Sequence, residues 1–274
     1  MRTSNPALND KVFEQARATS VAESGPGWAT GQALEQTYQA PAYRGPVVGE
    51  DTMTLNGVAW ASAALITLVV AAGVFGWNSV DRTSDVVAMP GWLFLVLFAG
   101  LGVAVLTIFK PKLARFTAPV YALLEGALLG AISALYNATY DGIVVQAVAM
   151  TIGVFAVMLF LFATRVIRVT DKLRMGIVAA TGGIMLVYVV NLVLGLFGGD
   201  LAFLESSSAM GIGISLLIVG VAAFNLLLDF DFVERGVEAG APRYMEWYAA
   251  FGLLVTLIWL YLELLRLLAK LQRR

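Results

Sequence analysis

The chain has 274 residues, of which 59% are hydrophobic and 14% are charged, and its net charge is −1. Soluble domains carry about 25% charged residues, so this composition indicates one polytopic membrane domain and gives no basic surface for nucleic acid. The sequence contains neither Cys nor His, which excludes disulfides, thiolate metal sites and every catalytic site that depends on histidine.

The first 55 residues are polar and are interrupted by Pro and Gly, as in Asn5-Pro6 and Gly25-Pro26-Gly27. Segments of this composition bury too little apolar surface to fold by themselves. We therefore predict a largely disordered N-terminal tail over residues 1–55, with one short helix near 7–18, and a membrane domain over residues 56–274.

Seven apolar segments follow, each with about the 20 residues that a helix needs to cross the hydrocarbon core. Because backbone polar groups in lipid must be satisfied within the segment, each one is predicted to be helical. The predicted fold class is thus an all-α polytopic membrane protein with seven transmembrane helices. In chain order the predicted spans are Gly57–Trp77, Gly91–Phe109, Thr117–Tyr136, Ile143–Thr164, Met175–Phe197, Met210–Leu228 and Trp247–Leu268.

Lys and Arg alternate between the loops. They are present after the second, fourth and sixth spans and absent after the third and fifth. Because cytoplasmic loops are enriched in Lys and Arg, this alternation predicts an inner (plasma) membrane protein with a cytoplasmic N-terminus and the C-terminus on the other side. Lys270, Arg273 and Arg274 favour the opposite side for the C-terminal end, which leaves open a seventh span that re-enters the membrane.

Small residues in the third span form a G-x-x-x-G pattern at Gly126 and Gly130. Glycines at this spacing let two helix backbones approach closely in a membrane. The pattern therefore predicts tight helix packing rather than a ligand site.

Polar residues end the sixth span. Asn225 and Asp229 are four residues apart and share a helix face near the cytoplasmic edge, whereas Asp231 points to another side if the helix continues. Two readings stay open at this point: a solvated acidic cluster at the interface, or the mouth of an ion pathway.

Two more carboxylates lie inside spans. Glu263 forms an i, i+3 pair with Arg266, which is either an ion pair within the helix or part of a hydrophilic path. Glu125 has no charged residue one turn away, so it needs a partner, a cavity or a proton. Neighbouring carboxylates at low dielectric cannot both ionise cheaply and can hold a proton or Ca²⁺. The candidate ion or proton pathway consists of Asp229, Glu263, Glu125, Asp231 and Asn225.

No span carries a nucleophile elbow, a phosphate-binding loop or a pair of facing aspartates. Motifs of this kind need a strand-turn-helix or a paired-carboxylate context that the chain does not offer. We therefore expect no enzymatic activity and no bound cofactor, with Ca²⁺ considered only as a permeant ion.

Two motifs near the end of the chain resemble the Bax inhibitor-1/YccA (TMBIM) family. They are Leu228-Asp229 after a long apolar span, and Trp259-Leu-Tyr-Leu-Glu263-Leu-Leu-Arg266 in the last span. The segments Ser4–Asn9 and Tyr121–Gly130 are similar to the actinobacterial branch of that family. The resemblance covers roughly residues 55–270 and implies a seven-helix fold whose last helix is central and wrapped by the other six.

The resemblance also implies a pH-sensitive calcium leak, cytoprotection and regulation of membrane proteases such as FtsH. The implied gate and proton sensor is an acidic pair on the sixth and last helices, which falls on Asp229 and Glu263; these are also the candidate Ca²⁺ ligands. Glu263 stands where Asp is usual, and contact with Asp229 requires the last helix to begin in the cytoplasm. The second span holds no Lys or Arg before Lys110, so Arg266 and Arg115 are the candidate latch residues.

These observations predict a pH-sensitive cation leak channel or transporter, with Ca²⁺ as the permeant ion and intramembrane carboxylates as its gate. The alternative is a regulator without transport activity that binds a membrane protease or another stress-response partner through its helices and tail. Deletion of residues 1–50 separates the two, because a leak pathway would keep its flux. The predicted partners are the lipid bilayer and a membrane protein, and not nucleic acid.

Overall fold

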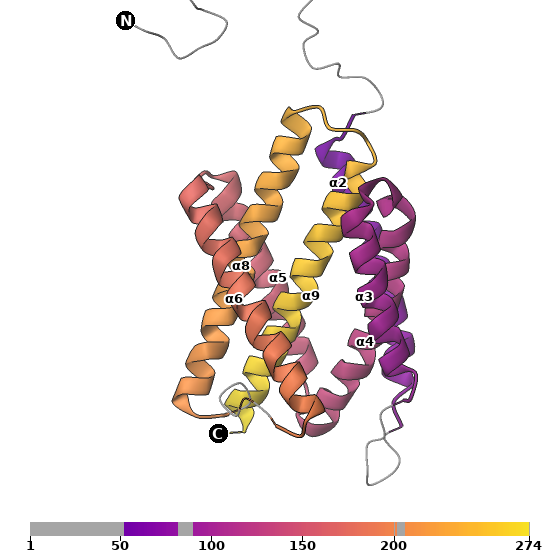
Figure 1. Cartoon of the computed structure of the whole chain (residues 1–274), viewed down its shortest axis with the longest axis vertical. Helices are drawn as coiled ribbons and strands as arrows, with labels where there is room; N and C mark the ends of the chain where they lie inside the picture. The colour runs from indigo at the N-terminus through magenta and orange to yellow at the C-terminus, as the bar shows by residue number, and fades with distance from the viewer. Residues whose placement is uncertain (1–51, 82–89, 200, 202–205, 274) are drawn as a thin grey trace, which may run out of the picture. The chain divides into compact units, whose positions relative to one another are not determined.

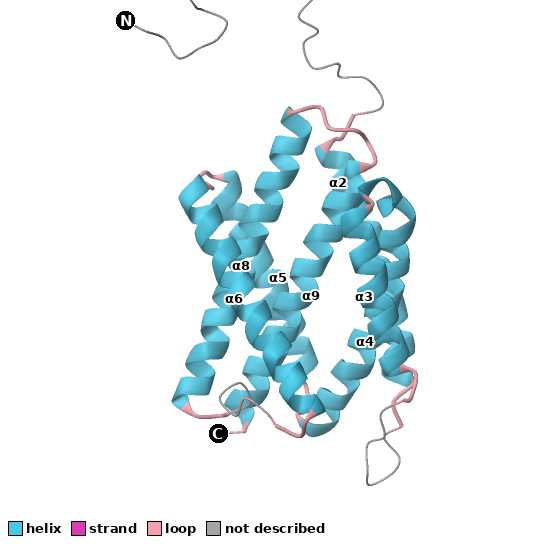
Figure 2. Cartoon of the chain, in the orientation of Figure 1, coloured by secondary structure: helices cyan, strands magenta, loops and turns pink. Residues whose placement is uncertain are grey.

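The computed structural model describes residues 52–81, 90–199, 201 and 206–273. Within these ranges the chain is all-helical (Figures 1 and 2), so the seven predicted spans are confirmed as helices. Residues 1–51 of the predicted tail, with the short helix near 7–18, lie outside the described residues. The helices are α2 (Leu55–Asn78), α3 (Leu93–Phe109), α4 (Ala114–Thr139), α5 (Ile143–Ala163), α6 (Asp171–Leu196), α8 (Ala209–Glu238) and α9 (Met245–Gln272), with the 3-10 turn η2 (Pro111–Leu113) before α4.

Six of these helices are long and apolar enough to cross a membrane, and α3 is a shorter apolar helix of 17 residues. Three of the helices begin at hydroxyl caps, where Thr54, Thr170 and Ser208 each accept a hydrogen bond from the backbone N–H three residues later. A cap of this kind satisfies one of the N–H groups that a helix start leaves without a partner. The starts of α2, α6 and α8 are thus encoded locally.

The end of α8 differs from the prediction, which stopped the sixth span at Leu228. The helix continues for ten more residues to Glu238. Its polar second half is held by ion pairs, because Asp231 contacts Arg174 of α6 and Glu234 contacts Arg165 after α5. Asp229 therefore lies about 14 Å before the end of α8 and not at the end of the helix.

The two ends of the bundle are distinguished by contacts between distant segments. Just before α2, the Met53 N–H donates to the Ala241 carbonyl (2.7 Å), so this segment lies beside the α8–α9 connection. At the other end, Arg273 donates to the Tyr140 hydroxyl between α4 and α5 (2.7 Å). The helix α9 is continuous between these ends, so the alternative of a re-entrant seventh span is not what the chain adopts (Figure 1).

The last helix is central, as predicted. The helices α2, α4, α5 and α8 pack directly against α9, and fifteen of its 28 residues are buried. The other two helices reach it through side chains, since Tyr188 of α6 bonds to Glu263, and Val103 of α3 packs on the cluster that contains Phe251 and Leu254. Every other described helix therefore contributes to the surroundings of α9.

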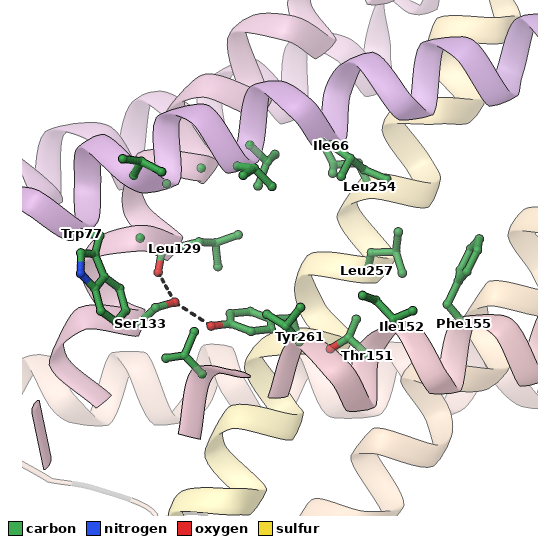
Figure 3. Close-up of a pocket in the computed structure, with 18 residues that line it drawn as sticks. Ile66, Trp77, Leu129, Ser133, Thr151, Ile152, Phe155, Leu254, Leu257 and Tyr261 are labelled. Atoms are coloured by element: carbon green, nitrogen blue, oxygen red, sulfur yellow. Dashed lines mark hydrogen bonds between the residues drawn. The ribbon is translucent and has the colours of Figure 1, made fainter. Parts of the chain in front are cut away.

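The pair α2 and α4 packs backbone against backbone. A Cβ on Gly130 would lie 1.9 Å from the Gly73 carbonyl oxygen, and one on Gly126 would lie 2.5 Å from the Val69 carbonyl oxygen. The prediction that Gly126 and Gly130 mediate tight packing is confirmed. Because α2 packs on α4 rather than on α5, a cavity of about 700 Å³ remains between α2 and α5 (Figure 3).

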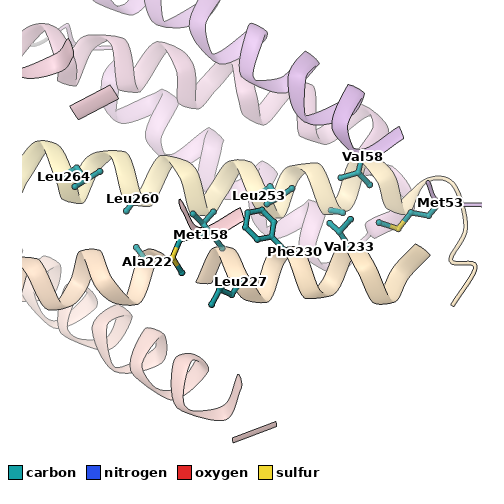
Figure 4. Close-up of a cluster of buried hydrophobic side chains, with 12 residues drawn as sticks. Met53, Val58, Met158, Ala222, Leu227, Phe230, Val233, Leu253, Leu260 and Leu264 are labelled. Carbon is teal, nitrogen blue, oxygen red and sulfur yellow. The ribbon is translucent and has the colours of Figure 1, made fainter. Parts of the chain in front are cut away.

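The pair α8 and α9 packs through side chains instead. Ala222, Leu227 and Phe230 of α8 belong to one buried cluster with Leu253 and Leu260 of α9 (Figure 4). Side chains of this size keep the two backbones apart and leave room for polar groups within the interface. This interface contains the candidate site.

Candidate functional site

Polar residues recur at heptad spacings along the interface of α8 and α9: Thr256, Glu263 and Lys270 are seven residues apart on α9, and Ser215 and Asp229 are fourteen apart on α8. Seven residues are close to two full helical turns, so residues at this spacing stay on one face of each helix. In order from the α8–α9 connection, the facing pairs form three levels: Asp229 with Thr256, Ala222 with Glu263, and Ser215 with Lys270.

The first and third levels fix this register, because Thr256 lies within hydrogen-bonding reach of Asp229 and Lys270 donates to the Ser215 hydroxyl (2.7 Å). The two helices are antiparallel, so Ala222, midway between Ser215 and Asp229, lies opposite Glu263. We call these three levels the α8–α9 polar seam.

The first level holds Asp229 next to a region of α9 without bulk. A Cβ on Gly252 would lie 3.9 Å from the Asp229 Oδ1, and Thr256 is one turn further along α9. The other carboxylate oxygen, Oδ2, is covered and has no hydrogen-bond partner among the described residues. A covered carboxylate oxygen without a donor is costly unless a proton or a cation joins it.

The second level holds Glu263, which is only 2% exposed. Its Oε1 accepts hydrogen bonds from the Tyr188 hydroxyl of α6 (2.6 Å) and from Arg266 (2.8 Å), and Arg266 also donates to Tyr188 (2.7 Å). The predicted Glu263–Arg266 pair is thus present. The second carboxylate oxygen of Glu263, Oε2, is buried and lacks a partner within the described ranges. Ala222 opposite Glu263 is small and brings no donor.

The third level places a buried cation at the far end of the seam. Lys270 is 3% exposed, and its Nζ also donates to the Gly211 carbonyl (3.2 Å). A buried ammonium is rare unless its protons are used in hydrogen bonds. Two carboxylates and one ammonium therefore follow one another along a single interface.

Asp229 and Glu263, the two members of the predicted acidic pair, both lie in the α8–α9 interface but do not meet. Asp229 is level with Thr256, and seven residues of α9 separate Thr256 from Glu263, which corresponds to about 10 Å along the helix. Glu263 bonds to Tyr188 and Arg266 instead. A cation or proton would therefore encounter the carboxylates one after the other.

The other two predicted residues of α8 contact α6. Asp231 is buried and paired with both Arg174 (2.5 Å) and Arg235 (2.7 Å), which is a structural ion-pair network. Asn225 donates to the Thr181 hydroxyl of α6 (2.8 Å). The structure thus brings Asp231 and Asn225 to α6, whereas Asp229 faces α9.

Two predicted residues lie on the opposite side of α9 from α8. Glu125 of α4 faces α3, where a Cβ on Gly100 would lie 3.3 Å from its Oε1, and Tyr121 is within hydrogen-bonding reach. Arg115 lies over the ring of Phe116 and forms no ion pair with a described residue. Neither residue is brought to Asp229 or Glu263.

Besides Thr256, three polar members of the site were not anticipated: Tyr188, Ser215 and Lys270. Tyr188 is an ordinary aromatic residue in its own span, and only the folded bundle places it beside Glu263. The other two carry a signal that the sequence does contain, since Ser215 and Asp229, like Thr256 and Lys270, are whole heptads apart. Reading the two spans as one antiparallel pair would have found them.

A comparison with family models matches the family described as Bax inhibitor 1 like over residues 5–273, nearly the whole chain. The chain belongs to the Bax inhibitor 1 like family. Neither the curated proteins nor the solved structures give a match. The match does not assign a branch, so membership of the actinobacterial branch stays a prediction.

In this family member, the described residues contain no group of three or more acidic side chains that could surround a metal ion. Ca²⁺ takes six to eight oxygen ligands. The Asp229 level offers one carboxylate and one hydroxyl, and the Glu263 level one free carboxylate oxygen. The seam is suited to brief contacts with a passing proton or cation rather than to a resident metal.

Proposed function

We propose that this Bax inhibitor 1 like protein is a proton-gated cation leak pathway in which ions move along the α8–α9 polar seam, with Ca²⁺ as the transported cation. The single observation that carries the proposal is the presence of two covered carboxylate oxygens, Asp229 Oδ2 and Glu263 Oε2, in the interface between α8 and α9. Neither oxygen has a donor among the described residues, so each requires a proton, water or a cation.

The gate follows from the charge on these groups. When Asp229 is protonated, it is neutral, and α8 can stay packed on α9 while Glu263 is paired with Arg266. Deprotonation brings negative charge into a low-dielectric interface, where it is strongly unfavourable until water or a cation enters. We expect the seam to hydrate and the flux to rise as the pH rises.

The direction of the protein in the membrane follows from its basic loops. Nine Lys and Arg residues lie around the bundle end where α2 begins: Lys110, Lys112, Arg115, Arg165, Arg168, Lys172, Arg174, Arg235 and Arg243. By the positive-inside tendency we propose that this end is cytoplasmic and that the protein lies in the plasma membrane. The Asp229 level is then nearer the cytoplasm than Glu263.

The test is calcium flux into proteoliposomes that contain the full chain and an enclosed calcium dye. We expect Asp229→Asn and Glu263→Gln each to lower the flux and to flatten its pH dependence. The matched control is Glu125→Gln, which neutralises an intramembrane carboxylate outside the seam and should leave the pH profile as it is.

Unchanged flux and pH dependence in both seam variants would contradict the proposal. A parent protein without flux that binds a membrane protease through its first 50 residues would instead support the regulator. In that case deletion of residues 1–50 would abolish the interaction, whereas it should leave a leak pathway active.

A further inference from the structure

A cavity of about 700 Å³ lies between α2 and α5, with α4 and α9 forming its back wall (Figure 3). This size is in the range of sites that bury a small ligand. We infer that this cavity holds one acyl chain of a membrane phospholipid from the leaflet in which α9 ends. The inference does not depend on the proposed transport function.

The cavity exists because of how its two walls are held. Gly73 and Gly130 bring α2 against α4, while α5 packs on α8 and α9 on the other side. The helices α2 and α5, which form the two sides of the cavity, are therefore separated by a gap that opens toward the lipid. Val70 on α2 and Ile152 on α5 line this opening and are 61% and 62% exposed, so the cavity is continuous with the lipid-facing surface.

The chemistry of the lining favours hydrocarbon over a polar ligand. Ser133 donates to the Leu129 carbonyl and bonds to the Tyr261 hydroxyl (2.6 Å each) (Figure 3). Thr151 donates to the Ala147 carbonyl (2.7 Å). The three hydroxyls of the lining are thus already bonded within the protein. An apolar chain can cover them without leaving a buried polar group unsatisfied.

The length of the cavity matches one leaflet. Eleven residues separate Ile66 from Trp77 on α2, and eleven separate Val144 from Phe155 on α5. At the rise of an α-helix this is about 16 Å, close to half of the roughly 30 Å hydrocarbon core. Trp77 and Val144 lie at the bundle end where α9 ends, so the cavity runs from that surface to the middle of the membrane.

This length also separates an acyl chain from a second copy of the protein. A transmembrane helix has a diameter of about 10 Å and would follow α2 or α5 across the whole bilayer. A cavity that stops halfway is matched by a lipid tail whose headgroup stays at the interface beside Trp77.

The experiment uses the full chain in nanodiscs that contain a phospholipid with a photoreactive diazirine halfway along one acyl chain. After irradiation, the cross-linked peptides are mapped by mass spectrometry. We expect the cross-links to concentrate on the cavity-lining parts of α2 and α5. Val148→Trp should fill the cavity and remove this concentration. Its control is Val190→Trp on α6, which starts from the same side chain at nearly the same exposure, 42% against 43%.

Cross-links spread evenly over all lipid-facing helices, or a Val148→Trp variant that labels like the parent, would overturn the inference. So would labelling there by a free fatty acid with the same diazirine but not by the phospholipid, or cross-linking of the cavity to a second chain. If Val148→Trp fails to fold, Val70→Trp fills the cavity from the opposite wall and the same results decide.

Discussion

The α2–α4 and α8–α9 pairs make their helix contacts in opposite ways. In the first pair, glycines place backbone on backbone, and a Cβ on Gly130 has no room at all. In the second pair, side chains hold the helices apart, and Asp229, Glu263 and Lys270 occupy the space between them. Both pairs lie in one bundle. The α2–α4 contact is made by glycines, whereas the α8–α9 contact contains charged groups.

The difference indicates which part of the bundle is fixed and which part can move. Close backbone contact leaves no second arrangement of similar energy, because any separation loses contacts along the whole helix. An interface with covered charges can gain by separating, since water would then reach Asp229 and Glu263. We therefore expect α2 and α4 to act as a scaffold and α8 to be the helix that responds to pH.

The largest expected effect tests the scaffold. Gly130→Ala places a Cβ 1.9 Å from the Gly73 carbonyl oxygen, so α2 and α4 must separate. We expect a loss of about 3 kcal/mol in the free energy of unfolding, at the upper end for an overpacked interior. Thermal unfolding in detergent measures it. Gly153→Ala on α5, where a Cβ meets open space, is the control, and an equal effect in both variants would contradict the account.

The next effect has the opposite sign. Asp229→Asn removes a charge from a covered site with an unpartnered oxygen, so we expect a gain of about 1–2 kcal/mol in neutral buffer. The gain should shrink as the pH falls, because a protonated Asp229 is as neutral as Asn. Unfolding midpoints of parent and variant across pH measure this, and a destabilised variant at neutral pH would show that Asp229 is a structural group.

A smaller effect is expected from two tyrosine hydroxyls: that of Tyr188, which contacts α9 from α6, and that of Tyr261, which belongs to α9. Tyr188→Phe removes a hydrogen bond to the charged Glu263, whereas Tyr261→Phe removes one to the neutral Ser133. We expect losses of about 1.5 and about 0.5–1 kcal/mol, respectively, because bonds to charged groups are stronger. Only Tyr188→Phe should change the pH dependence of calcium flux, and a change in both would remove the distinction between the two sides of α9.

The smallest effect is expected outside the membrane core. Glu246, which is buried, accepts hydrogen bonds from the Thr54 N–H (3.0 Å) and hydroxyl (2.9 Å) and thereby ties the start of α2 to α9. Glu246→Gln keeps an acceptor, so we expect a loss of less than about 1 kcal/mol. Faster hydrogen exchange at Thr54, with no change in the middle of α2, would be the signature. Slower or unchanged exchange would show that the contact is dispensable.

The sequence was sufficient for the features that depend on local composition. Hydropathy predicts all seven helices, and the G-x-x-x-G spacing predicts close packing of α4, although not that its partner is α2. It fails where distant residues decide. The span ending at Leu228 is extended because Arg165 and Arg174, from other parts of the chain, neutralise Glu234 and Asp231.

The same reason explains the candidate site. A single span can show that Glu263 and Arg266 are neighbours, but not that Tyr188 completes their network. The resemblance implies an acidic pair of Asp229 and Glu263, but the sequence leaves open whether the two residues meet. The register of α8 on α9, which is set by packing along both helices, places the two carboxylates on successive levels.

The central claim is that the α8–α9 seam admits water when Asp229 loses its proton. Because the chain has no cysteine, Ala222→Cys introduces a single thiol opposite Glu263, at a position that is fully buried. We predict that a membrane-impermeant thiol reagent labels it in proteoliposomes in alkaline buffer and not in acidic buffer, whereas Ala122→Cys, an equally buried position on α4, stays unlabelled in both. Equal labelling at the two positions would contradict the account.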